Sequence, residues 1–459
     1  MIVKGDRAEH SNVDELARSL RHAALPLESV DDLDPLLDAI GDARYVLLGE
    51  ASHGTHEFYT WRAELSKRLI QEKHFSFVGV EGDWPDCYRV NRFVKGYASS
   101  GASAAEVLHA FDRWPTWMWA NREIVDFTEW MRDHNHQLPA EQQAGFYGLD
   151  VYSLWESMAA VIDYLEKIDP NFARVARRAY TCFEPYREDV QEYARATAIV
   201  PTSCEDEAVA VLRALRSRAA EYKEDGREAY FNAEQNALVA RGAELYYRTM
   251  VRGGPTSWNV RDHHMVDTLD RLMVHHDNMG GRAKAIVWAH NTHIGDARFT
   301  DMARAGMVNV GQLVRQSHEV EGMMLVGFGT HHGSVIAGDE WGARMQRMRV
   351  PDAREGSIED LLHRSEAGAS ENNDSGPNKM LLFNGEDDGG IKGLDAPLDN
   401  RAIGVVYDPR MERYGNYVRT IIPRRYDAFL FIDETSALDP LHMPMGVTGA
   451  MPETYPSGM

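Results

Sequence analysis

The chain has 459 residues and a formal net charge of −22, from 49 Lys and Arg against 71 Asp and Glu. An acidic surface repels phosphate backbones and anionic lipids, so the composition argues against nucleic acid and membranes as partners. No run approaches the roughly 20 apolar residues that cross a bilayer, and residues 1–20 lack the apolar core of a secretion signal. With 44% hydrophobic residues, the chain suits one large fold or two packed units.

The cysteines bear on the compartment. Cys87, Cys182 and Cys204 are far apart in the sequence and cannot all pair. We therefore expect a reducing environment, the cytoplasm. Nothing in the sequence predicts the oligomeric state.

Short apolar and β-branched runs predict buried strands. Each run has five or six residues with little internal polarity, which is typical of a parallel sheet covered on both faces. In chain order, the runs are 45–49, 75–80, 145–149, 285–289, 324–328, 402–407 and 428–432.

Helical patterns lie between these runs. Residues 56–71 carry Phe58, Trp61 and Leu65 three or four positions apart, and residues 121–133 repeat this register. Alternating strands and helices predict an α/β fold, with a mainly parallel sheet covered by helices.

The middle of the chain is different. Residues 151–225 contain no glycine and are rich in Ala, Glu and Arg. They predict helices that Pro170, Pro185 and Pro201 interrupt or separate. We interpret residues 151–252 as an all-helical insertion or subdomain. The α/β catalytic core then comprises residues 1–150 and 253–459. The alternative is that these helices simply belong to the layer covering the sheet.

Two segments late in the chain are expected to form a surface loop and a poorly ordered tail. Residues 365–399 contain many Ser, Asn, Asp and Gly residues, which predicts a surface loop. The tail after Pro440 is expected to be poorly ordered. No internal repeat is visible.

Polar residues follow the predicted strands where they end. The first four runs lead into Glu50, Glu81, Asp150 and His290, and the fifth leads to His331. In open parallel sheets, ligands bind beyond the carboxyl ends of the strands. The residues expected to meet in one cleft are Glu50, His53, Glu81, His290 and His293.

Glu50 and His53 lie three residues apart in the segment Gly49–Gly54. A carboxylate there can hold an imidazole in one tautomer and raise its basicity, as a general base requires. The segment also suits a simple helix start, with Ser52 or Thr55 as the cap.

The other candidates also have alternatives. His290 and His293 form a pair after a buried run, and metal binding is the rival interpretation, although no HExxH motif is present. Glu81 ends an apolar strand, so it is either paired or functional. Arg62 is a natural partner for Glu81 or for a substrate anion, and a purely structural pair is the alternative.

Aromatic residues suggest a pocket for a large apolar ligand, although core packing explains them equally well. Trp114, Trp117 and Trp119 fall within six residues, and Trp84 and Tyr88 show the same ambiguity. GxSxG, P-loop and GxGxxG motifs are absent from their expected contexts.

Three blocks together resemble the erythromycin esterase family: GEASHG at 49–54, VEGDWP at 80–85 and WAHNTHIGD at 288–296. The resemblance extends over about residues 44–435. It implies an α/β core with an added helical part, and hydrolysis of esters or lactones, in some members the macrolactone of erythromycin-type antibiotics. It also implies that His53 acts as the general base on water without a metal or cofactor, served by Glu50, Arg62, Glu81, His290 and His293.

We therefore expect a carboxylic ester hydrolase acting on a small-molecule ester or lactone. The alternatives are a divalent-metal hydrolase using the same cleft, a natural-product lyase, and a binding protein. The long segment 365–399 and the pair His331–His332 depart from the family pattern. The residues expected to contact substrate are Trp84, Tyr88, Trp114, Trp117, Asp150 and His331.

Overall fold

A mixed β-sheet forms the centre of the protein. The structure, a computed structural model, describes residues 14–186, 190–199, 203–222, 226–250, 254–365, 377–383 and 391–442. The strand order is β1-β8-β11-β6-β2-β5-β3-β4, with β7 paired to β6. The strands are β1 (Leu25–Pro26), β2 (Tyr45–Leu48), β3 (Phe77–Asp83), β4 (Gly145–Asp150), β5 (Ala285–Trp288), β6 (Met323–Ala337), β7 (Gln346–Val350), β8 (Lys379–Leu382) and β11 (Ala428–Thr435).

The predicted fold class is confirmed. The strands from β11 through β6, β2, β5 and β3 to β4 run parallel, while β1–β8, β8–β11 and β6–β7 are antiparallel pairs. Leu48 lies opposite Trp288 on one side and Val326 on the other. This register brings the segments that follow β2 and β5 to the same edge.

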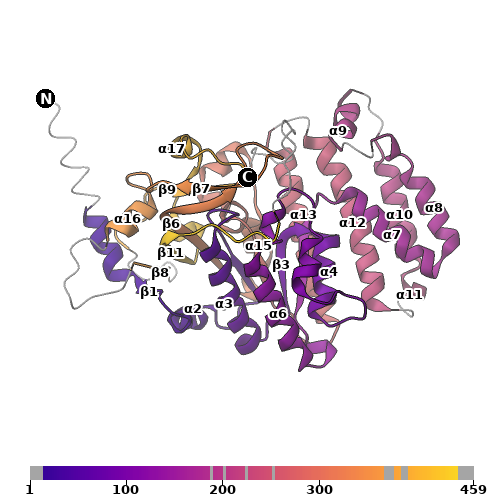
Figure 1. Ribbon diagram of the computed structural model, residues 1–459, viewed down its shortest axis with the longest axis horizontal. Coiled ribbons are helices and arrows are strands. Elements are labelled where there is room, and N and C mark those ends of the chain that lie inside the picture. The colour runs from indigo at the N-terminus through magenta and orange to yellow at the C-terminus, as the bar shows by residue number, and fades with distance from the viewer. Residues whose placement is uncertain are drawn as a thin grey trace.

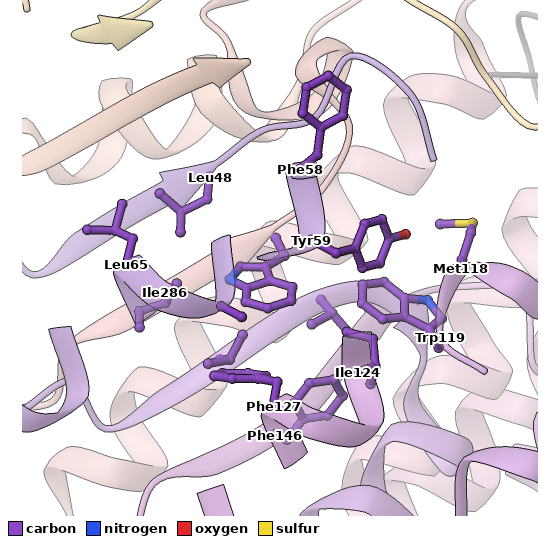
Figure 2. Close-up of a cluster of buried hydrophobic side chains, with 14 of the residues drawn as sticks. Leu48, Phe58, Tyr59, Leu65, Met118, Trp119, Ile124, Phe127, Phe146 and Ile286 are labelled. Carbon is purple, nitrogen blue, oxygen red and sulfur yellow. The ribbon is translucent and has the colours of Figure 1, made fainter. Parts of the chain in front are cut away.

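Helices cover both faces because the central strands alternate between two apolar cores. Val46 and Leu48 face one core, while Tyr45 and Leu47 face the other. Figure 2 shows the first core, where Leu48 of β2 and Leu65 of a covering helix lie in the same apolar cluster. This face is covered by α2 (Asp34–Ile40), α3 (His56–Lys73) and α6 (Arg122–His136), and the opposite face by α13 (Thr256–Asp277), α15 (Val310–His318) and α16 (Ile358–Arg364).

A group of helices lies beyond the β4 edge of the sheet, at the right of Figure 1. They share a core of their own that includes Val161, Phe172, Leu212 and Tyr246. The division at residues 151–252 stays a prediction. The helices are α7 (Leu154–Ile168), α8 (Pro170–Tyr180), α9 (Val190–Ile199), α10 (Glu205–Ser217), α11 (Ala219–Tyr222) and α12 (Arg227–Met250).

Shorter elements complete the fold around the sheet. They are α4 (Trp84–Val94), α5 (Ala104–His109), α14 (Asn291–Ile294), α17 (Glu412–Gly415), α18 (Ile422–Arg425), and the hairpin of β9 (Leu398–Arg401) with β10 (Tyr417–Thr420). In the described part of the chain, no helix is both long enough and apolar enough to cross a bilayer.

The structure corrects the prediction for residues 402–407. This segment makes only isolated bridges, Ser52 to Ile403 and Gly338 to Val406, instead of joining a sheet. Its apolar residues are buried because it crosses over the loop after β2, where the Ile403 amide donates to the Ala51 carbonyl. The burial of this segment therefore gives it the apolar sequence pattern of a strand, although it is not one.

The predicted surface loop at 365–399 is also corrected in part. Residues 379–382 form β8 between β1 and β11, and Met380 and Leu381 are buried there. Residues 366–376 and 384–390 lie outside the described residues. The predicted disorder of the tail after Pro440 falls mainly on residues 443–459, which lie outside them too.

Two cysteines that are remote in sequence are neighbours in space. Cys182 and Cys204 form a disulfide across a separation of 22 residues, and Cys87 is free and buried. Disulfides are rare in reducing compartments. The structure thus removes the cysteine argument for a cytoplasmic location, which stays an expectation only.

Candidate active site

A pocket opens at the carboxyl ends of the parallel strands. His53 follows β2, Glu81 lies near the end of β3, and Asp150 ends β4. Arg261 reaches the same pocket from α13, on the opposite side of the sheet from α3. The remaining lining comprises Gly82, Asp83, Asp86, Phe111, Arg113, Trp114, Pro115, Met118, Trp119, Tyr152, Trp341 and Val405.

Two glycines allow the loop that carries Glu50 and His53 to pack closely against neighbouring segments. A Cβ on Gly49 would lie 2.1 Å from the Asn291 side-chain oxygen, and one on Gly54 would lie 2.0 Å from the Ile336 carbonyl oxygen. Both positions therefore require the absence of a side chain. Thr55 is the residue before α3, but its hydroxyl bonds to Ser52 and makes no cap bond to the helix.

His53 is held by Glu50. Its Nδ1 lies 2.9 Å from Glu50 Oε1, and Glu50 Oε2 accepts a 2.7 Å bond from Arg62 Nη2. Because the carboxylate accepts, Nδ1 carries the proton and Nε2 keeps a lone pair. Burial would lower the pKa of His53, but the charges of Glu81 and Glu50 outweigh it and raise that pKa above its usual value. Glu50 therefore orients the imidazole of His53, and the two carboxylates raise its basicity, as a general base requires.

Arg62 pairs with Glu50 and not with Glu81, which corrects the predicted pairing. Its side chain is fully buried, and its guanidinium lies over the rings of Tyr59 at 4.3 Å and Trp288 at 4.8 Å. Position 62 lies two turns into α3, and neither Arg62 nor Glu50 lines the pocket. Arg62 therefore fixes the carboxylate that fixes His53.

The partner of Glu81 is Arg261, which the sequence reasoning missed. Arg261 Nη2 donates to Glu81 Oε1 at 2.6 Å, and the His290 amide donates to Glu81 Oε2 at 2.9 Å. Burial would raise the pKa of Glu81, but His293, Arg261 and His53 hold that pKa well below its usual range. Glu81 Oε1 lies 4.0 Å from His53 Nε2, so a fixed anion faces the basic nitrogen.

Arg261 also clamps Asp150 through two bonds. Its Nε donates to Asp150 Oδ1 at 3.0 Å, and its Nη2 donates to Oδ2 at 2.7 Å. The sequence contained a signal for this role of Arg261, because Trp258 and Met265 place it on the apolar, buried face of α13. A buried arginine at such a position requires carboxylate partners.

His293 lies behind Arg261. Its Nδ1 lies 2.9 Å from Asp262 Oδ1, and its Nε2 accepts from Arg261 Nη1 at 3.1 Å. The ring stacks on Trp258 with centroids 4.4 Å apart, and it is not part of the pocket lining. His293 thus supports Arg261 instead of facing the pocket.

His290 lies beside His53, with ring centroids 4.9 Å apart. Its Nδ1 accepts from the Thr292 amide at 3.3 Å and lies 2.8 Å from the Thr292 hydroxyl. The proton therefore sits on Nε2, which is buried and makes no hydrogen bond of normal geometry among the described residues, although the backbone of Ala51 lies near enough to raise the pKa. Burial and then the neighbouring His53 hold the pKa of His290 well below its usual value, so His290 is a neutral donor.

The polar groups of this site do not fit a divalent ion. Among the described residues, no group of three His, Cys, Asp or Glu side chains converges as metal ligands. The guanidinium of Arg261 already occupies the space between Glu81, Asp150 and His293. A second cation there would meet a fixed positive charge.

The outer part of the pocket combines acids with aromatic rings. Burial raises the pKa of Asp83 to about 6 and that of Asp86 to about 7. Asp83 accepts a 2.9 Å bond from Arg113. Trp114 packs on Trp341 with centroids 4.6 Å apart, and both line the pocket. Trp341 was not predicted because it lies in a turn without a surrounding motif.

The other predicted substrate contacts lie away from this lining. Trp84 is fully buried and stacks on Tyr88 and Tyr147, in the core beneath α13. Trp117 is fully buried behind Trp114. His331 stacks on His363 with centroids 3.8 Å apart. Packing against neighbouring side chains accounts for these residues. Of the predicted substrate contacts, only Trp114 and Asp150 line the pocket.

Comparison with known proteins identifies the family of the chain. The sequence profile of the erythromycin esterase family matches residues 70–435. The chain belongs to the erythromycin esterase family. The erythromycin esterase type II of Escherichia coli is 21% identical over 434 residues, which are 90% of this chain and 94% of that protein. The profile match includes Glu81, His290 and His293 and begins after His53.

Solved structures with the erythromycin esterase fold include three similar chains. A succinoglycan biosynthesis protein has a TM-score of 0.74 at 22% identity, covering 94% of this chain and 99% of that one. A Bacillus cereus protein has a TM-score of 0.75 at 17% identity, with the same coverage. A mutant of the erythromycin esterase EreC, in its open conformation, has a TM-score of 0.63 at 16% identity, covering 89% of this chain and 94% of that one.

Proposed function

We propose that this protein hydrolyses a carboxylic ester or lactone, with His53 as the general base on water. The observation that carries the proposal is the position of His53. Its Nδ1 is bonded to a buried carboxylate, and its side chain lines a pocket next to Glu81. Membership of the erythromycin esterase family supports this class of reaction.

The chemistry follows from the protonation states. A water molecule in the pocket gives a proton to His53 Nε2 as its oxygen bonds to the ester carbonyl carbon. The imidazolium that forms lies between the carboxylates of Glu50 and Glu81, which stabilise its charge. Nε2 then returns the proton to the leaving oxygen as the carbon–oxygen bond breaks, so the base is regenerated.

His290 is suited to assist at the carbonyl oxygen. Its Nε2–H is a buried donor that makes no hydrogen bond of normal geometry among the described residues, and the ring is neutral. A donor of this kind gains strength where a carbonyl oxygen becomes an anion. Its place beside His53 would put that donor near the carbon under attack.

The pocket favours a substrate with a bulky apolar body. Trp114, Trp341 and Phe111 give it an aromatic wall, and Val405 extends the apolar surface. A macrolactone such as erythromycin, the substrate class named for the relatives, has such a body. Macrolides are therefore the first substrates to test.

The test compares His53→Ala with His56→Ala on erythromycin and on p-nitrophenyl esters. His56 is a matched control, because it also bonds a glutamate but lies half-exposed outside the pocket. Loss of the base is expected to lower kcat by about 10²–10⁴-fold in His53→Ala alone. Mass spectrometry should show a gain of one water in the product. Turnover by His53→Ala at the wild-type rate would refute the assignment.

A further inference from the structure

We infer that Arg261 is a catalytic residue of the proposed hydrolysis, donating a hydrogen bond to the substrate carbonyl oxygen as it becomes an oxyanion. This inference deepens the proposed function and rests on it. Arg261 lines the same pocket as His53, although 208 positions separate the two in the sequence. It comes from α13, an element that none of the sequence blocks described above includes.

The guanidinium of Arg261 has more donors than its neighbours use. A guanidinium has five N–H groups. Four of those of Arg261 are used: two by Asp150, one by Glu81 and one by His293. None of the hydrogen bonds among the described residues uses the fifth, on Nη1. Arg261 also forms part of the pocket wall, so a cation with one donor to spare borders the space that substrate would fill.

The guanidinium of Arg261 is held rigidly. The bonds to Asp150 and Glu81 fix the plane of the guanidinium, and Asp262 fixes His293, which in turn fixes Nη1. Arg261 is also covered by the ring of Tyr152 at 4.9 Å. Donors that need no rearrangement during the reaction stabilise a developing anion most effectively.

Arg261 also lies close to the proposed base, His53. Glu81 Oε1 lies 4.0 Å from His53 Nε2 and 2.6 Å from Arg261 Nη2, so one oxygen separates base and guanidinium. A carbonyl group held in the pocket can therefore face His53 with its carbon and Arg261 with its oxygen. The remaining predicted arginine, Arg62, cannot do this because it lies behind Glu50.

The decisive variant is Arg261→Lys, which keeps the positive charge and loses the planar fork. Arg401→Lys is the matched control. Arg401 is also fully buried and bonds Glu412 at 2.8 Å, but it does not line the pocket. Thermal unfolding of both variants separates loss of fold from loss of function. We expect Arg261→Lys to lower kcat by about 10²–10³-fold with KM little changed, and Arg401→Lys to keep the wild-type kcat.

A second measurement needs no turnover. The anion of phenyl methylphosphonate has the tetrahedral shape and charge of the intermediate, and its affinity can be measured by calorimetry. Wild type and His56→Ala should bind it equally, because His56 lies outside the pocket, while Arg261→Lys should bind it about 10²-fold more weakly.

The two results separate the two proposals. If wild type hydrolyses no ester but Arg261→Lys still loses phosphonate affinity, the proposed function fails and the donor role stands. If wild type hydrolyses esters and folded Arg261→Lys keeps the wild-type kcat, the inference about Arg261 is overturned. Equal phosphonate affinity in wild type and Arg261→Lys also overturns it.

Discussion

The pKa of His53 offers a direct test of the buried acid–base arrangement. The perturbation is Glu50→Gln, which keeps the shape of the partner and removes its charge. In wild type, Glu50 and Glu81 hold the pKa of His53 above 6.5 against the opposing effect of burial. The neutral amide is expected to lower the pKa, because the imidazolium loses an anion 2.9 Å from Nδ1.

The magnitude follows from the kind of bond that changes. A hydrogen bond to a charged group contributes about 1.5–3 kcal/mol, and a neutral one about 0.5–1.5 kcal/mol. The difference, about 1–1.5 kcal/mol, is the stabilisation of the imidazolium that is lost with the charge of Glu50. The pKa of His53 should therefore fall in Glu50→Gln.

The assay is an NMR titration of the histidine ring signals, with His53 assigned by the signal missing in His53→Ala. His56 is an internal control, since its pKa is raised by Glu123 and Glu50 does not contact it. Where turnover is measurable, the rate should fall as the pH drops through the pKa of His53, because protonation removes the base. In Glu50→Gln this fall moves to lower pH.

Glu50→Gln also leaves the buried charge of Arg62 without its carboxylate. Breaking a buried pair costs about 3–5 kcal/mol, so the variant can unfold. The double variant Glu50→Gln/Arg62→Met removes both charges and keeps the experiment decisive. A pKa of His53 at or below the ordinary value of a histidine in wild type, or an unchanged pKa in both variants, would refute the role given to Glu50.

Three further predictions concern packing, the disulfide and a buried acid. Trp84→Ala should lower the free energy of unfolding by about 3–5 kcal/mol without changing KM, whereas Trp114→Ala should raise KM, as denaturation and kinetics will show. Replacing Cys182 and Cys204 by serine removes the disulfide and should lower the free energy of unfolding by about 3 kcal/mol. Added reductant should then leave the Tm of this variant unchanged. Burial raises the pKa of Asp86 to about 7. The free energy of unfolding therefore falls as the pH rises from about 4 to 7, because the unfolded chain loses this proton first. Asp86→Asn should therefore raise Tm at pH 8.

Much of the fold was predictable because burial on both faces leaves an unmistakable pattern. The runs that became β2, β3, β4, β5, β6 and β11 are short and almost wholly apolar. The same signal failed at residues 402–407, where a buried crossing segment is equally apolar but pairs with no strand along its length. It also missed β8, which is buried within a segment of polar and turn-forming composition.

The sequence alone determined which residue types end the strands, and hence that Glu50, His53 and Glu81 meet at one edge. Only the tertiary structure decided their partners. Glu81 pairs with Arg261, 180 positions away, because α13 packs across the opposite face of the sheet and delivers its guanidinium to that edge. Periodicity reports which face of an element is buried, but it carries no information about which distant charge will neutralise a buried carboxylate.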